Sequence, residues 1–195
     1  MAQTSTTLLA SKSHIADKTG TIISFTKTGT EYKISSSDTS TINLGSYSQF
    51  DLITVTNASN SANNSTFTVK SVSANNDFII VEEEVVTESA GQNITLDHTG
   101  FVSDKAKGDG YFSQPDGVHT VSYQVDGTLT GSIKMQGSLA TTPTEDDFFD
   151  ISGTTFTADQ STLISTANFT GNFVWIRAKA TSVTAGTISS VLVNS

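Results

Sequence analysis

Apolar and polar residues alternate in residues 131–139, which read GSIKMQGSL. The alternation sorts the side chains into two sets, Ile133, Met135 and Leu139 against Ser132, Lys134, Gln136 and Ser138. A period of two residues is typical of a β-strand that buries one face. Similar stretches recur between turn signals along the chain, and no stretch has the pattern of a long amphipathic helix. We therefore expect an all-β protein.

Ser and Thr together make up 60 of the 195 residues, and hydrophobic residues make up 35%. Thr suits a half-exposed pleated surface and Ser suits turns. A hydrophobic content this low is workable for thin β-sandwiches, in which only alternate residues face inward.

The formal net charge is −9, and the chain has no cysteine. No basic patch exists that could neutralise a run of phosphates, so we expect no nucleic-acid partner. The lack of cysteine excludes disulfides, thiolate metal sites and cysteine nucleophiles.

Residues 1–18 predict an extended N-terminal arm. Their one apolar run, from Leu8 to Ala10, follows no basic region, so we expect neither a signal peptide nor a membrane partner. Polar termini are ordinarily disordered unless something holds them. We expect a neighbouring chain to hold this arm through Leu8, Leu9 and Ile15, and docking onto its own chain is the alternative.

The rest of the chain divides into two predicted domains. Residues 19–100 contain six or seven short strands between polar turns, which predicts a small β-barrel or sandwich. The polar segment 97–100 marks the boundary. Residues 101–195 alternate in longer stretches with regularly spaced turns, which predicts a β-sandwich with a jelly-roll-like arrangement.

The segment 172–179, NFVWIRAK, is apolar on both faces of a predicted strand. Phe173 and Trp175 lie on one face, and Ile176 is on the other. A strand with two apolar faces either lies under a loop or meets a second packing partner. Phe173 and Trp175 are therefore candidate interface residues toward another subunit.

No pattern in the sequence predicts a catalytic centre, a cofactor or a metal site. The three histidines, His14, His98 and His119, are far apart and lack the spacing of metal ligands or of a nucleophile's base. Oxygen ligands for calcium could collect in the acidic loop 145–150, but its spacing matches no EF-hand. We expect a non-enzymatic protein without cofactors.

Three aromatic residues are candidates for stacking on the face of a sugar: Tyr111, Phe112 and Trp175. Jelly-roll modules often bind glycans in this way. The competing interpretation places Trp175 and the phenylalanines in the core, and it is favoured because the chain has one tryptophan and aromatic residues make up only 8% of it.

Two parts of the chain resemble modules of structural proteins from tailed bacteriophages, notably those that infect marine bacteria. The segments that carry the C-terminal resemblance are GDGYFSQPDGVHTVSYQVDG (108–127), GSIKMQGSLATTPTEDDFFDI (131–151) and TGNFVWIRAKATSVTAGTISSVLVN (170–194). Residues 51–91 are similar to another β-rich module of phage particles. Together the two modules cover nearly all of the chain after the arm, and their motifs are strand and turn residues.

The resemblance implies a virion component that is assembled in the bacterial host cytoplasm. We expect a capsid decoration, or cement, protein that binds the major capsid protein or other virion proteins, with residues 1–18 as the clasp. By analogy with such proteins we expect a homo-oligomer, with a trimer as the leading state. The alternatives are a tail, collar or fibre component, and a carbohydrate-binding adhesin module that uses Tyr111, Phe112 and Trp175.

Overall fold

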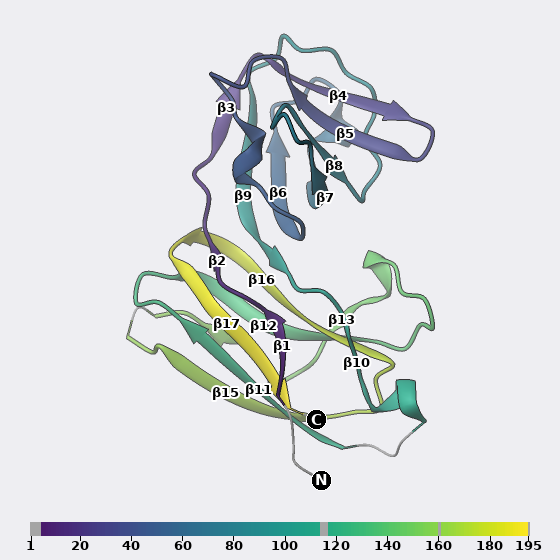
Figure 1. The fold of residues 1–195 in the computed structure, drawn as a ribbon, viewed down its shortest axis with the longest axis vertical. Helices are drawn as coiled ribbons and strands as arrows, with labels where there is room; N and C mark the ends of the chain where they lie inside the picture. Colours follow the sequence, from purple (N-terminus) through teal and green to yellow (C-terminus); the bar gives the residue numbers. More distant parts are fainter. Residues whose placement is uncertain (1–4, 114–116, 160, 195) are drawn as a thin grey trace. The chain divides into compact units, whose positions relative to one another are not determined.

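The computed structural model describes residues 5–113, 117–159 and 161–194 (Figure 1). It confirms the all-β prediction, because the longest helix in the described part has four residues. The strands are β1 (Ser5–Leu9), β2 (Lys12–Ser13), β3 (Lys18–Gly20), β4 (Ile23–Thr28), β5 (Glu31–Ser36), β6 (Asp51–Thr56), β7 (Thr66–Val72), β8 (Phe78–Val81), β9 (Ile94–Val102), β10 (Ala106–Lys107), β11 (Val118–Val125), β12 (Thr130–Ser138), β13 (Phe149–Asp150), β14 (Phe156–Thr157), β15 (Ile164–Thr170), β16 (Trp175–Ala185) and β17 (Thr187–Asn194). The 3-10 helices are η1 (Leu44–Ser46), η2 (Ser61–Asn63), η3 (Asp109–Phe112) and η4 (Glu145–Asp147).

The chain forms two compact units. The N-terminal unit is Ile15–Gly100, and the C-terminal unit combines the segment that ends at His14 with the chain from Phe101 onward. The two units divide after Gly100, at the domain boundary that the polar segment 97–100 predicts. The assignment of residues 1–18 to a separate arm differs from this division, because the described residues up to His14 belong to the C-terminal unit.

In the N-terminal unit the strands lie in the order β9-β6-β7-β8-β5-β4, and β3 pairs with β9. Its core is formed by the inward residues of these strands, such as Phe25, Ile34 and Ile79, each exposed by 1% or less. The hairpin of β7 and β8 turns at Asn76, whose φ is 61°. Asn tolerates this left-handed conformation better than most residues, so Asn76 suits the tight turn of this hairpin.

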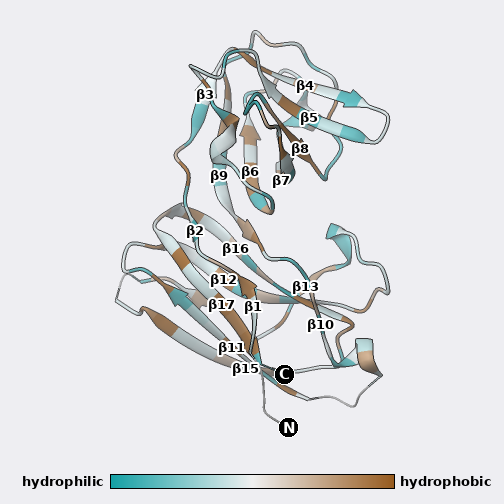
Figure 2. Cartoon of the chain, viewed as in Figure 1, coloured by the Kyte–Doolittle hydropathy of each residue, from teal (hydrophilic) through white to brown (hydrophobic). Residues whose placement is uncertain are grey.

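The C-terminal unit contains two sets of paired strands. One has the order β1-β17-β11-β15, and the other includes β13, β12 and β16, with β10 and β14 at its margins. Both sets contribute side chains to a single hydrophobic core, for example Val121 and Val191 from the first and Ile133 and Ile176 from the second. Two sheets that share one core in this way form a β-sandwich. In Figure 2 hydrophobic positions recur along β17, and three of its residues, Ile188, Val191 and Val193, are buried in this core.

Residues 5–14 of the predicted arm dock onto the C-terminal unit of their own chain, which corrects the expectation that a neighbouring chain holds them. β1 pairs antiparallel with β17, and β2 pairs with the start of β17. Leu8 and Leu9 are 7% and 6% exposed within the core of the C-terminal unit. Ile15 packs against the core of the N-terminal unit. Leu8 and Leu9 are buried and Ile15 is partly buried within this chain, so the clasp hypothesis loses most of its apolar contacts.

The second packing partner expected for segment 172–179 is also supplied by the chain itself. Phe173 is 9% exposed and packs against Phe169 and Phe149. Gly137 and Gly171 make room for its ring, since a Cβ on either glycine would lie within 2.6 Å of a ring atom. Phe173 is therefore a core residue and not an interface residue.

The alternation in residues 131–139 is confirmed in its first half. Ile133 and Met135 are fully buried, whereas Leu139 lies beyond the end of β12 and is 64% exposed. Gln136, expected on the solvent side, is 5% exposed. It is covered because the Nε atom of Arg177 donates a hydrogen bond of 2.9 Å to its Oε1 atom.

Candidate functional site

The structure brings together the three aromatic residues that the sequence names as glycan contacts. The ring centroid of Tyr111 lies 5.3 Å from that of Phe112 and 5.2 Å from that of Trp175. Both pairs meet edge to face, at interplanar angles of 73° and 65°. Edge-to-face contacts are a favourable geometry for aromatic pairs. We call Tyr111, Phe112 and Trp175 the aromatic cluster.

Two members of the aromatic cluster lie at the surface. Tyr111 is 43% exposed and Phe112 is 56% exposed, while Trp175 is partly buried. The interpretation that places Trp175 and the phenylalanines in the core is therefore wrong for Phe112. Large aromatic side chains left in contact with water and grouped together are typical of a binding surface.

The aromatic cluster is assembled by a short stretch of strand pairing. β10 pairs antiparallel with β16, which sets Lys107 opposite Trp175. η3 follows directly and carries Tyr111 and Phe112 over to the same place. The indole Nε1 atom of Trp175 donates a hydrogen bond of 3.2 Å to the carbonyl oxygen of Thr141, which fixes the orientation of the ring.

Two glycines allow η3 to approach β16 closely. The N–H of Gly108 donates to the carbonyl of Val174, and the N–H of Gly110 donates to that of Phe173. A Cβ on Gly110 would lie 2.8 Å from the carbonyl oxygen of Asn172, so a side chain there would force η3 away. The Gly-Asp-Gly sequence at 108–110 is thus the local signal for the site, and sequence reasoning gave it no weight.

Two lysines flank the aromatic cluster. The Nζ atom of Lys107 lies 4.1 Å from the centroid of the Tyr111 ring and 6.0 Å from that of Phe112. The Nζ atom of Lys105 lies 5.5 Å from the centroid of Trp175. These are cation–π distances, so the ammonium groups stand beside the rings that a ligand would meet.

Asp109, in η3, connects this helix to a buried histidine. His119 is fully buried, its Nε2 atom lies 3.4 Å from Oδ2 of Asp109, and its ring stacks on Phe169. The same Oδ2 atom accepts a hydrogen bond of 2.7 Å from the N–H of Gly117. His119 is thus a core residue, and Asp109 anchors η3 beside it.

The carboxylates of the acidic loop 145–150 are engaged by their own chain. Oε1 of Glu145 accepts a hydrogen bond of 2.7 Å from Nη1 of Arg177. Asp147 caps η4 by accepting from the backbone and hydroxyl of Thr144. The hydrogen bond from Lys134 holds the pKa of Asp150 below its ordinary value, and Gln136 lowers it further although burial opposes both. These carboxylates stabilise the loop instead of converging on one point.

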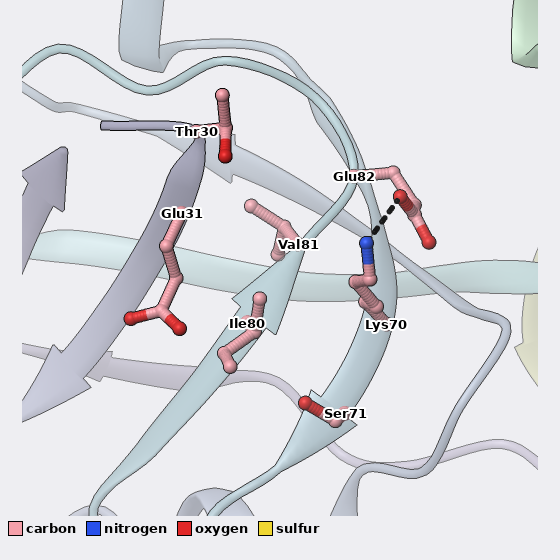
Figure 3. Close-up of a pocket in the computed structure, with 7 residues that line it drawn as sticks. All are labelled: Thr30, Glu31, Lys70, Ser71, Ile80, Val81 and Glu82. Carbon is pink, nitrogen blue, oxygen red and sulfur yellow. Dashed lines mark hydrogen bonds and ion pairs between the residues drawn. The ribbon is translucent and has the colours of Figure 1, made fainter. Parts of the chain in front are cut away.

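The N-terminal unit contains an open hollow of about 310 Å³ (Figure 3). Its walls include Ile80, Lys70 and Glu82, and the last two form an ion pair of 3.4 Å across its rim. The hollow lies beside the hairpin of β7 and β8. Both side chains of this ion pair are more than a third exposed, so the pair contributes little to stability. The residues that line the hollow do not form a catalytic or metal-binding arrangement.

Within the described ranges, no group of three or more His, Cys, Asp or Glu residues is arranged to hold a metal ion. The described part of the chain also has no helix of the length and hydrophobicity needed to cross a membrane. Comparisons with protein-family models, with curated proteins and with solved structures find no match to the chain.

Proposed function

We propose that this protein is a non-enzymatic structural component of a phage virion, and that it decorates the capsid. The resemblance of residues 51–91, 108–151 and 170–194 to modules of phage structural proteins supports the virion assignment. The acidic chain, with a net charge of −9, suits a protein that lies on a particle without binding the packaged genome.

The observation that supports assembly most directly is the chemistry of two sheet edges in the C-terminal unit. β1 and β15 are the outermost strands of their sheet, and neither contains a charged residue. Edge strands are ordinarily protected by lysine, proline or a covering loop because an exposed edge pairs with other chains. By contrast the edge strand β4 carries Lys27, which pairs with Glu84.

β15 has the features of a strand that receives a partner. Its seven residues all pair with β11 without a bulge, and among the described strands none pairs with the edge that faces away from β11. Ile164 is 60% exposed and the preceding Leu163 is 52% exposed. We commit to a second copy of the chain as the occupant, with β15 of one copy beside β1 of the next. A contact between two different edges builds a closed ring when the rotation between copies closes, and a trimer is one such ring.

The test is a lysine placed on the unprotected edge. Thr166 is exposed on β15, and T166K adds a charge that must be desolvated if a strand pairs there. We expect wild-type protein to form an oligomer by light scattering and to bind particles made without it, and we expect T166K to lose both. T28K, on the edge strand β4, is the matched control and should retain both. A wild-type monomer that binds no particle would refute the proposal.

A second candidate function is carbohydrate binding, as in an adhesin module. The observation that favours it is the exposed aromatic cluster of Tyr111, Phe112 and Trp175. A glycan array separates the two candidates, because a protein that only decorates a capsid should give no saturable signal. A tail, collar or fibre component remains the alternative position for the same structural role.

A further inference from the structure

The lysines beside the aromatic cluster differ from most other basic residues of this chain. Lys27, Lys33, Lys70 and Lys134 each lie within 4.0 Å of a carboxylate oxygen. Among the residues that the structure describes, Lys105 and Lys107 form no such ion pair, and both ammonium groups lie over aromatic rings instead. In a chain with 19 acidic and 10 basic residues, two lysines beside one aromatic cluster and without an ion-paired carboxylate are available to an anion from outside.

The rings and the lysines recognise different parts of a ligand. Exposed aromatic faces bind flat apolar surfaces, such as the C–H face of a pyranose ring. Ammonium groups bind carboxylates through charge-assisted hydrogen bonds. We propose that the aromatic cluster, together with Lys105 and Lys107, binds an acidic sugar residue, a hexuronate, within an otherwise neutral glycan. This proposal rests on the carbohydrate-binding candidate and not on the decoration role.

A nucleic acid also offers flat rings and negative charge, but it fits this chain less well. Single strands bind to grooves that follow the backbone with many positive charges. Here two lysines stand in a chain of net charge −9, which repels a polymer with a phosphate on every nucleotide. A glycan with one carboxylate among neutral sugars meets the two lysines and avoids most of this repulsion.

Trp175 makes the proposal directly measurable, because it is the only tryptophan in the chain. Its fluorescence therefore reports on the aromatic cluster alone. We expect a trisaccharide that ends in glucuronate to change this fluorescence saturably. The same trisaccharide ending in glucose should bind at least roughly tenfold more weakly, because it lacks the charge-assisted hydrogen bonds.

Variants separate the two halves of the site. K105Q/K107Q should bind the acidic and the neutral trisaccharide equally, whereas K105R/K107R should restore the preference for the acidic one. Y111A should weaken binding of both. K70Q, which removes a lysine that pairs with Glu82 in the N-terminal unit, is the matched control and should behave as wild type. Circular dichroism of each variant establishes that it folds.

Three outcomes would overturn the proposal. The first is no saturable change with the glucuronate trisaccharide up to millimolar concentration. The second is equal affinity of wild type for the acidic and the neutral trisaccharide. The third is a single-stranded oligonucleotide that binds more tightly than the acidic trisaccharide. None of these outcomes changes the expectation for T166K on β15, so the glycan proposal and the structural role fail independently.

Discussion

Gly108 lies so close to Phe173 that a Cβ atom on Gly108 would stand 2.4 Å from the carbonyl oxygen of Phe173. The N–H of Gly108 already donates a hydrogen bond of 3.0 Å to the carbonyl of Val174. This contact between the start of η3 and the segment before β16 determines where Tyr111 lies relative to Trp175. The aromatic cluster therefore depends on a glycine that is not one of its members.

We predict that G108A displaces η3 and disrupts the aromatic cluster. The added methyl group meets backbone atoms, which cannot rotate away, so we expect a loss of stability of about 1–3 kcal/mol. The emission of Trp175 should shift to longer wavelength as Tyr111 moves away. Chemical unfolding followed by Trp175 fluorescence measures both effects. An unchanged spectrum together with an unchanged free energy of unfolding would contradict this account of η3.

The docked N-terminal segment predicts a large effect of truncating Leu9. Its side chain is 6% exposed in the core of the C-terminal unit, and L9A removes most of it. Leu→Ala substitutions in a core reduce the free energy of unfolding by about 2–5 kcal/mol. Thr6, exposed in the same strand, provides the control T6A, which should change stability by less than ~0.5 kcal/mol. If L9A were as stable as T6A, the segment would not be part of this core.

We predict that the buried hydroxyl of Tyr123 contributes to the free energy of unfolding. It donates a hydrogen bond of 2.6 Å to the carbonyl of Thr154, and the side chain is 1% exposed. Burial raises the pKa of this phenol, so it stays neutral and remains a donor through the whole physiological range. We expect Y123F to lower the free energy of unfolding by about 1–2 kcal/mol, since it leaves a buried carbonyl unpaired. Y32F, at a partly exposed tyrosine, should have a smaller effect in the same denaturation experiment.

We predict that the ionisation of Asp159 makes the stability of the protein depend on pH in the acidic range. Hydrogen bonds from the N–H groups of Thr162 and Ser161, and from the Ser161 hydroxyl, lower its pKa to about 2. Because this folded-state pKa is below the unfolded value of about 3.9, the contribution of Asp159 to stability is present above pH ~4 and is lost as the pH falls toward 2. The difference in melting temperature between wild type and D159N should therefore shrink over this range. A carboxyl carbon of Asp159 that titrates near pH 4 by NMR would contradict the prediction.

The sequence predicts the class of fold because alternation is a local property. Ile133 and Met135 show it directly, since neighbours two positions apart share a face in any β-strand. The same argument fails at Leu139, where the chain has already left β12. It also fails at Gln136, because its burial depends on Arg177, which lies in another strand.

The strand onto which the N-terminal segment docks could not be predicted either, because this contact also depends on a distant part of the chain. Leu8 and Leu9 are recognisably apolar, but nothing local indicates that β17, at the other end of the chain, receives them. For the aromatic cluster the sequence shows which residue types are candidates, but it does not show that they lie close together. Their proximity results from the pairing of Lys107 with Trp175. The Gly-Asp-Gly sequence at 108–110 is the one local signal that indicates close backbone approach there.

Electron micrographs of purified phage particles labelled with an antibody against this protein test the central claim most directly. A capsid decoration protein predicts label distributed over the surface of the head, in many copies on every particle. Label confined to the tail would keep the structural role and contradict the capsid position. Particles that carry no label, with the protein recovered only from the soluble fraction of infected cells, would contradict the virion role itself.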